Sequence, residues 1–260
     1  MKNLRKYGNP PFSIVVLHGG PGARGEMAPV AKELSTLYGI LEPLQTTTSL
    51  DREIKELLLI LKKDGDIPMT LIGHSWGALF SYIFAARYPL LVKKIILIGS
   101  GCFEEKYSKN IMKTRLGRLN KREKADVFSL MKTLGDPTIE DKNVALTRFG
   151  KLISKADSYD PLQYNNEALE CNFQIYQGLW EDTEKIRHKE KLLNLGKLIQ
   201  CPVVAIHGKY DPHPCEGIKE SLSKILKDFR FIIMDNCGHY PWIEKNAKDD
   251  FYNILKKELE

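Results

Sequence analysis

Apolar residues gather in short runs along the chain, and most runs are followed by a stretch with helical spacing. The runs at 13–17, 39–44, 69–73 and 94–99 predict strands, and the stretches at 27–37, 50–63 and 76–87 predict helices. After residue 199 the alternation resumes, with predicted strands at 203–206 and 230–234 and predicted helices at 216–226 and 242–259. Strands that are apolar along their length and alternate with helices are typical of a parallel sheet covered on both faces.

The alternation is interrupted between residues 102 and 199, which contain helical segments and no convincing strand. The pattern therefore predicts a core made of residues 1–101 and 200–260, with residues 102–199 inserted as a helical cap. The insertion leaves from the end of a predicted strand. Because ligands of open parallel sheets bind at the carboxyl ends of the strands, a cap starting there is expected to cover the ligand crevice.

Composition narrows the possible classes of protein. With 260 residues, 43% hydrophobic and 28% charged, the chain has ordinary globular composition, and its aliphatic runs are too short to span a membrane. Five cysteines without a CxxC pair favour free thiols and a cytoplasmic location over disulfides or a zinc site. The net charge of +6 does not indicate nucleic-acid binding. Seven cationic residues between 109 and 124 form either a solvated helix face or a surface that attracts an acidic substrate or partner.

One pentapeptide carries a nucleophile signal. Residues 73–77 read Gly-His-Ser-Trp-Gly, between a predicted strand and a predicted helix. In this G-x-S-x-G context the sharp turn lifts the hydroxyl of Ser75 clear of the sheet, and the glycines avoid collisions around it. Ser75 is therefore the predicted nucleophile, in preference to a chance glycine-rich turn.

A serine nucleophile needs a base and an acid that orients the base. His239 follows the predicted strand 230–234, and Asp211 follows the strand 203–206, which gives the chain order serine, acid, histidine. His213, between two prolines, is a weaker competitor for the base, while His207 within its strand indicates a structural role. Alternative acids are Glu104 and Glu105, just after the strand 94–99.

Two backbone amides are expected to stabilise an oxyanion. One belongs to Trp76, directly after the nucleophile. The other comes from the loop His-Gly-Gly-Pro-Gly at residues 18–22, where we assign Gly20, with Gly19 as the alternative.

The same loop also supports a competing function. Residues 20–25 match G-x-G-x-x-G, and Glu42 closes the next strand, as in a dinucleotide-binding oxidoreductase. Pro21 opposes this interpretation because it removes an amide where a pyrophosphate would bind. A non-enzymatic ligand receptor is a third hypothesis, which the complete set of catalytic residues disfavours.

The chain resembles the α/β-hydrolase superfamily over nearly its whole length. The His-Gly-Gly-Pro-Gly loop, Ser75 followed by Trp76, and the long helical cap are similar to the proline iminopeptidase branch. The resemblance implies an α/β-hydrolase fold, cleavage of an N-terminal residue from a peptide or arylamide, and cap glutamates that hold the substrate's amine, with Glu170 as the closest match. No cofactor or metal is implied.

Three departures leave the substrate open. About eleven residues precede the first predicted strand, so the usual leading strand hairpin is expected to be missing and the fold truncated at its N-terminus. His74 stands where the resemblance to the peptidases implies a glycine, as in Gly-Gly-Ser-Trp-Gly. The glycine loop continues with Ala23 and Arg24 instead of further glycines. These features fit a carboxylesterase, lactonase or C–C bond hydrolase equally well.

The sequence thus predicts a serine hydrolase acting on a small molecule or short peptide. Aromatic residues of the cap are candidates for an apolar pocket wall, and Trp242 lines the site or starts the last helix. The candidate wall residues are Phe149, Tyr164, Phe173, Tyr176 and Trp180.

Overall fold

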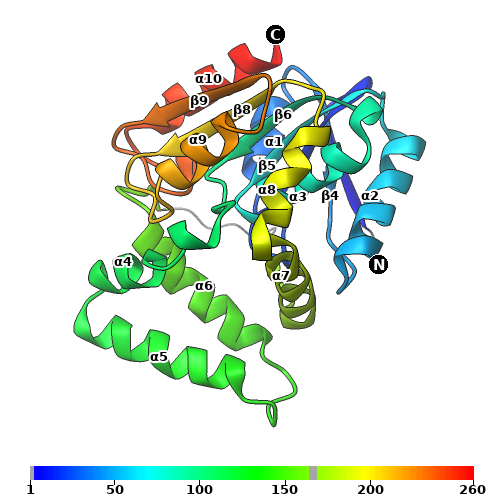
Figure 1. The fold of residues 1–260 in the computed structure, drawn as a ribbon. Coiled ribbons are helices and arrows are strands. Elements are labelled where there is room, and N and C mark those ends of the chain that lie inside the picture. The colour runs from blue at the N-terminus through cyan, green and yellow to red at the C-terminus, as the bar shows by residue number, and fades with distance from the viewer. Residues whose placement is uncertain (1–2, 164–168) are drawn as a thin grey trace.

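The fold is known from a computed structural model that describes residues 3–163 and 169–260. Its centre is a seven-stranded sheet in which every pairing is parallel except that of the first strand (Figure 1). In spatial order the strands are β1 (Leu4–Tyr7), β4 (Gly39–Pro43), β2 (Phe12–Leu17), β5 (Met69–His74), β6 (Val92–Ile98), β8 (Val203–Gly208) and β9 (Phe229–Met234).

Both faces of the sheet are buried, which explains why its strands are apolar along their length. In β2, Val15 and Leu17 pack on one face while Ile14 and Val16 pack on the other, as the two-residue period of a strand requires. The first face is covered by α2 (Leu50–Asp64), α3 (Trp76–Arg87) and α9 (Glu216–Ser223), and the second by α1 (Ala28–Leu34) and α10 (Lys248–Leu259).

The segment between β6 and β8 is mainly helical. It holds α4 (Ile111–Gly117), α5 (Lys121–Gly135), α6 (Asn143–Asp157), α7 (Phe173–Arg187) and α8 (Lys191–Asn194). Figure 1 shows α4, α5 and α6 lying beyond one end of the sheet, whereas α7 and α8 return along α3. Short 3₁₀ turns complete the chain at Pro89–Leu91, Glu105–Tyr107, His188–Glu190, Leu195–Leu198 and Pro241–Ile243.

The sequence-based α/β fold class and the mostly parallel sheet are confirmed, with two additions. Strand β1 lies in the first eleven residues, where no strand was expected, and pairs antiparallel with β4 at the sheet edge. It is short, basic and only partly buried, so it lacks the apolar run of the central strands. The helical segment also contains the two-residue strand β7 (Glu170–Cys171), which pairs with β3 (Ala23–Arg24).

Candidate active site

Three predicted catalytic residues lie at the carboxyl ends of sheet strands. Ser75 follows β5 directly, Asp211 lies three residues beyond β8, and His239 lies five residues beyond β9. Since β5, β6, β8 and β9 are adjacent and parallel, their ends meet at one edge of the sheet. The topology therefore brings together residues that are up to 164 positions apart in the chain (239 − 75).

Ser75 occupies a strained turn between β5 and α3. Its backbone has φ 52° and ψ −112°, a combination that side-chain-bearing residues rarely adopt. The turn depends on its two glycines. A Cβ on Gly73 would lie 2.2 Å from the Gly77 carbonyl oxygen, and a Cβ on Gly77 would lie 2.4 Å from the Leu17 carbonyl oxygen. The G-x-S-x-G spacing is therefore a steric requirement of this turn.

His239 is held by Asp211 through a short hydrogen bond. The Nδ1 of His239 donates to Oδ2 of Asp211 at 2.6 Å, and both side chains are buried. Burial lowers the pKa of His239 to about 4, against the attraction of Asp211. Burial alone would raise the pKa of Asp211, but the neighbouring imidazoles of His239 and His213 hold it well below its usual range. The ring of His239 is thus neutral near pH 7, with Nε2 able to accept a proton.

A second buried histidine ties the nucleophile turn to the His239 loop. The Nδ1 of His74 faces Glu26 Oε2 at 3.0 Å, and its Nε2 faces the carbonyl oxygen of His239, also at 3.0 Å. The ring of His74 therefore bridges the carboxylate of Glu26 and the backbone of the His239 loop. The same oxygen of Glu26 accepts the amide of Gly19 at 2.7 Å, so one carboxylate links the glycine loop to the turn at Ser75.

The amides of Gly19 and Gly20, both candidates for the oxyanion, differ in their hydrogen bonds. The Gly19 amide is engaged by Glu26, whereas Gly20 uses its carbonyl oxygen to accept the amide of Ala23 at 2.7 Å. Trp76 is the first residue of α3, where helix amides lack partners within the helix. Its indole is buried and donates to Thr183 of α7 at 2.8 Å.

The helical segment contacts the His239 loop directly. The amide of His239 donates to the carbonyl oxygen of Asp157, at the end of α6, at 2.8 Å. The carboxylate of Asp157 is completely buried and accepts two hydrogen bonds from Arg115 of α4, at 2.8 and 2.6 Å. The buried carboxylate of Glu244 strengthens the junction, because it accepts the amides of Gly238, Tyr159 and Asp160 at 2.8–2.9 Å.

The predicted substrate-binding residues lie in different surroundings. Glu170 is exposed on β7, with its carboxylate 3.8 Å from both Arg5 and Arg24. Trp242 is buried behind the site, its ring at a right angle to that of His74 with centroids 4.7 Å apart. Trp180 is partly exposed on α7 and stacks on Tyr176.

The remaining candidates for the pocket wall lie apart from one another. Tyr176 lies against the glycine loop, because a Cβ on Gly22 would be 3.1 Å from its amide nitrogen. Phe149 packs in a separate small core of the helical segment, and Phe173 lies under the Lys142 ammonium group. Tyr164 lies outside the described residues.

The competing candidates have other partners. Glu104 accepts a hydrogen bond from Ser221 and pairs with Lys106, and Glu105 is exposed. Glu42, the acid of the dinucleotide motif, is buried and accepts the hydroxyl of Tyr7 at 2.7 Å. His213, in contrast, contacts Asp211 directly, with its Nδ1 2.7 Å from Oδ1.

Sequence reasoning missed three acids that support the site, of which Asp157 and Glu244 are buried and Glu26 is partly buried. Glu26, Asp157 and Glu244 carry no motif, and each acts through backbone groups that sequence does not reveal. Two of them carried a weak signal, because Glu26 adjoins the glycine-rich loop and Glu244 lies five residues after His239, whereas Asp157 lies among polar residues.

One group of described side chains has the spacing of metal ligands. Atoms of Asp211, His213 and His239 lie within 4.8 Å of one another. The facing nitrogen and oxygen atoms are already joined by hydrogen bonds, which account for the cluster without a cation.

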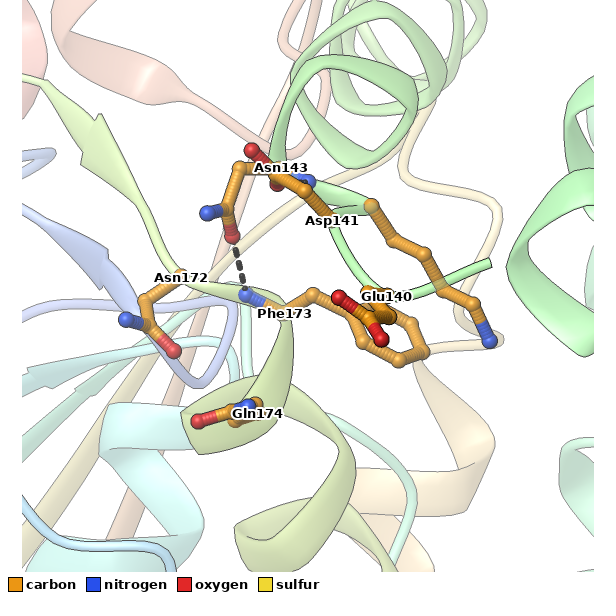
Figure 2. Close-up of a pocket in the computed structure, with 7 residues that line it drawn as sticks. Glu140, Asp141, Asn143, Asn172, Phe173 and Gln174 are labelled. Atoms are coloured by element: carbon orange, nitrogen blue, oxygen red, sulfur yellow. Dashed lines mark hydrogen bonds between the residues drawn. The ribbon is translucent and has the colours of Figure 1, made fainter. Parts of the chain in front are cut away.

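A separate pocket of about 280 Å³ lies in the helical segment, between the start of α6 and the start of α7 (Figure 2). The amide of Phe173 donates to Asn143 Oδ1 across its wall at 2.8 Å. Among the predicted site residues, Phe173, a candidate for the pocket wall, lines it, whereas Ser75, Asp211 and His239 do not. The lining residues are Glu140, Asp141, Lys142, Asn143, Asn172, Phe173 and Gln174.

Within the described ranges, no helix combines the length and apolar character that crossing a membrane requires.

Comparisons with known proteins place the chain in a fold family. The chain is 24% identical to a proline iminopeptidase of Heyndrickxia coagulans, over 93% of this chain and 91% of the relative. Among solved structures, it is similar to a carboxylesterase of Nitrososphaera gargenis (TM-score 0.63, 20% identity, 98% and 93% coverage). It is also similar to the enol-lactonase of Burkholderia xenovorans LB400 (TM-score 0.61, 16% identity, 98% and 95% coverage). The alpha/beta hydrolase fold family model matches residues 45–246, and the chain therefore belongs to this family.

Proposed function

We propose that this protein is a serine hydrolase that cleaves an ester or amide bond of a small molecule or short peptide. The observation that carries the proposal is the combination of a strained Ser75 with the Asp211–His239 hydrogen bond at the same edge of the sheet. Strain at a nucleophile turn is retained only where the surrounding structure enforces it, and such turns concentrate at functional sites.

The proposed reaction proceeds through an acyl-enzyme. Ser75 Oγ attacks the substrate carbonyl carbon while His239 Nε2 takes the hydroxyl proton, and Asp211 stabilises the resulting imidazolium. The amides of Gly20 and Trp76 donate to the oxyanion. The imidazolium then gives its proton to the leaving group as the acyl–leaving group bond breaks. Water next attacks the acyl-enzyme, with His239 accepting its proton, and Ser75 is released as the hydroxyl.

The choice of Gly20 for the oxyanion rests on the partners of its neighbour. Gly19 donates its amide to Glu26, so that amide has no hydrogen left for the substrate. A Cβ on Gly19 would also lie 2.6 Å from His74 Nδ1 and 3.0 Å from the Ser75 Cβ. Gly19 therefore provides the close approach of the loop to the nucleophile, and Gly20 provides the donor.

We further propose that residues 102–199 act as the cap that selects the substrate of the core formed by 1–101 and 200–260. Tyr176 packs beside the glycine loop, and Trp76 is anchored to Thr183, so α7 lies directly beside the oxyanion donors. On the same helix the exposed Trp180 stacks on the ring of Tyr176.

The charge around Glu170 favours esters or lactones over peptides with a free N-terminus. An aminopeptidase needs a carboxylate whose charge is free to pair with the substrate ammonium group. The Glu170 carboxylate is placed between the guanidinium groups of Arg5 and Arg24, which compensate its charge.

Two measurements test the proposal. The first is covalent labelling by a fluorophosphonate probe, with the modified peptide located by mass spectrometry. Labelling is expected at Ser75 and is lost in Ser75→Ala, while turnover of any substrate falls by several powers of ten. The matched control is Ser223→Ala, which removes an exposed serine at the end of α9 and leaves labelling unchanged. Normal turnover by Ser75→Ala would refute the mechanism.

The second measurement compares hydrolysis of acyl esters of increasing chain length with hydrolysis of a prolyl arylamide. Ester turnover that depends on Ser75 is expected to exceed arylamide turnover. A dominant arylamide rate, lost when the amine is blocked and in Glu170→Gln, would establish the aminopeptidase alternative and assign Glu170 to the substrate amine.

A further inference from the structure

The carboxylate of Asp211 serves two imidazoles. Its Oδ2 accepts Nδ1 of His239 at 2.6 Å, and its Oδ1 accepts Nδ1 of His213 at 2.7 Å. The amide of His213 donates to the same Oδ1 at 2.9 Å. The two rings are nearly parallel, with centroids 4.7 Å apart. The acid of a serine hydrolase needs only one histidine partner, so the second imidazole calls for a function of its own.

The chain holds His213 rigidly at this position. Pro212 and Pro214 flank it and fix the backbone on both sides. Its carbonyl oxygen accepts Nε2 of His207 at 2.9 Å, and the same nitrogen lies 3.8 Å from Oδ2 of Asp211, so a third histidine supports the loop beside the carboxylate. Only 9% of His213 is exposed.

Four charged or titratable groups face His213. Asp211 attracts a proton to its ring, whereas Arg115, His207 and His239 oppose one. Burial acts in the same direction and lowers the pKa of His213. Rings this close cannot both be protonated without strong repulsion, and they therefore titrate as a coupled pair.

We propose that His213 is a positioning residue for the catalytic base: by occupying the second oxygen of Asp211, it orients the carboxylate and draws negative charge away from His239. The proposal rests on the proposed function of Ser75, Asp211 and His239. Its consequence is that His239 stays an unprotonated base at lower pH than it would if Asp211 had one histidine partner.

The negative charge of Asp211 is shared between the imidazoles of His213 and His239. Each hydrogen bond to the carboxylate lowers its ability to stabilise the imidazolium of His239. Among the described residues, removing the His213 ring leaves the amide of residue 213 as the remaining donor to Oδ1. The carboxylate then interacts more strongly with His239, and the pKa of His239 rises.

The experiment measures the rate of Ser75 labelling by the fluorophosphonate probe as a function of pH. This rate reports protonation of His239 in the free enzyme and needs no knowledge of the substrate. The variants are His213→Ala, which removes the ring, and His213→Asn, whose amide can still donate to Asp211. The matched control is His188→Asn, which removes an exposed histidine outside the cluster.

The acid limb of labelling is expected to move to higher pH by about one unit in His213→Ala and by about half a unit in His213→Asn. The limb stays in place in His188→Asn. Thermal unfolding of each variant checks that the fold is retained, and the labelling limb is compared only among folded variants. If His213→Ala does not fold, the His213→Asn shift decides alone.

An acid limb that is unchanged in both folded variants, or that moves to lower pH, would overturn the role of His213. This failure is distinct from failure of the proposed function. If Ser75 of the unaltered protein is not labelled at any pH, the serine mechanism itself is wrong, and the His213 variants carry no weight.

Discussion

Replacing Arg115 with methionine removes the charged partner of a buried carboxylate. Asp157 is fully enclosed, and Arg115 donates to both of its oxygens at 2.8 and 2.6 Å. Breaking such a pair from one side costs about 3–5 kcal/mol, because the remaining charge stays buried without compensation. The Arg115 side chain is 17% exposed, so water reaches part of the pair and the lower figure of about 3 kcal/mol is expected.

The effect of Arg115→Met can be measured both as stability and as turnover. Urea titration of Arg115→Met gives a free energy of unfolding about 3 kcal/mol below that of the unaltered protein, with a midpoint of thermal unfolding roughly 6–12 °C lower. The Asp157 carbonyl oxygen also accepts the His239 amide. A shift of this junction displaces His239, the proposed base, and turnover is expected to fall by up to about 100-fold.

Two further variants test the reasoning. Lys155→Met breaks an exposed ion pair with Glu123, which solvent screens, so this variant is expected to change stability little and serves as the matched control. The double variant Arg115→Met with Asp157→Asn removes both charges and recovers part of the loss, as a double-mutant cycle would reveal. A loss below about 1 kcal/mol in Arg115→Met would refute the role of this pair in holding Asp157, whose carbonyl oxygen joins the helical segment to the His239 loop.

Three other predictions concern the turn at Ser75, the pH dependence of stability, and the effect of a metal chelator. Gly77→Ala is expected to abolish Ser75 labelling, because its Cβ would meet the Leu17 carbonyl oxygen, whereas Gly150→Ala, with open space around it, keeps full labelling and is the control. Stability is expected to fall as the pH is lowered from 7 to 5, since burial lowers the pKa of His18 and His239 to about 4 and the unfolded chain binds these protons near pH 6.5. Urea titrations at the two pH values measure this loss, about 1–2 kcal/mol for each histidine, and equal stabilities would contradict it. Incubation with EDTA is expected to leave turnover unchanged because hydrogen bonds alone join the acid to its histidines, and loss of activity that zinc restores would refute this.

The local signals of the site were readable from the sequence because they are steric. The glycines two positions on either side of Ser75 exist where a Cβ would collide with backbone, so their spacing marks the turn wherever it occurs. Likewise, strands buried on both faces are apolar along most of their length, which made β2, β5 and β6 recognisable. Strand β1 escaped recognition because an edge strand of four residues has no such requirement.

The interpretation of single polar residues was less secure. Glu170 looked suited to bind an amine, yet its carboxylate lies beside two arginines that are distant in the chain. Trp242 was open to two interpretations, and its ring packs against His74 in the core. Neither environment could be anticipated, because it depends on which segments fold against each other.

The sequence by itself determined the α/β class, the helical segment between two strands, and the candidates Ser75, Asp211 and His239, since each is encoded by apolar periodicity or a local turn. Only the tertiary structure decided how those candidates are supported. Glu26, His74, Asp157 and His213 act through hydrogen bonds to backbone or carboxylate atoms of other loops. Such bonds depend on distance in space, and no periodic pattern along the chain records them.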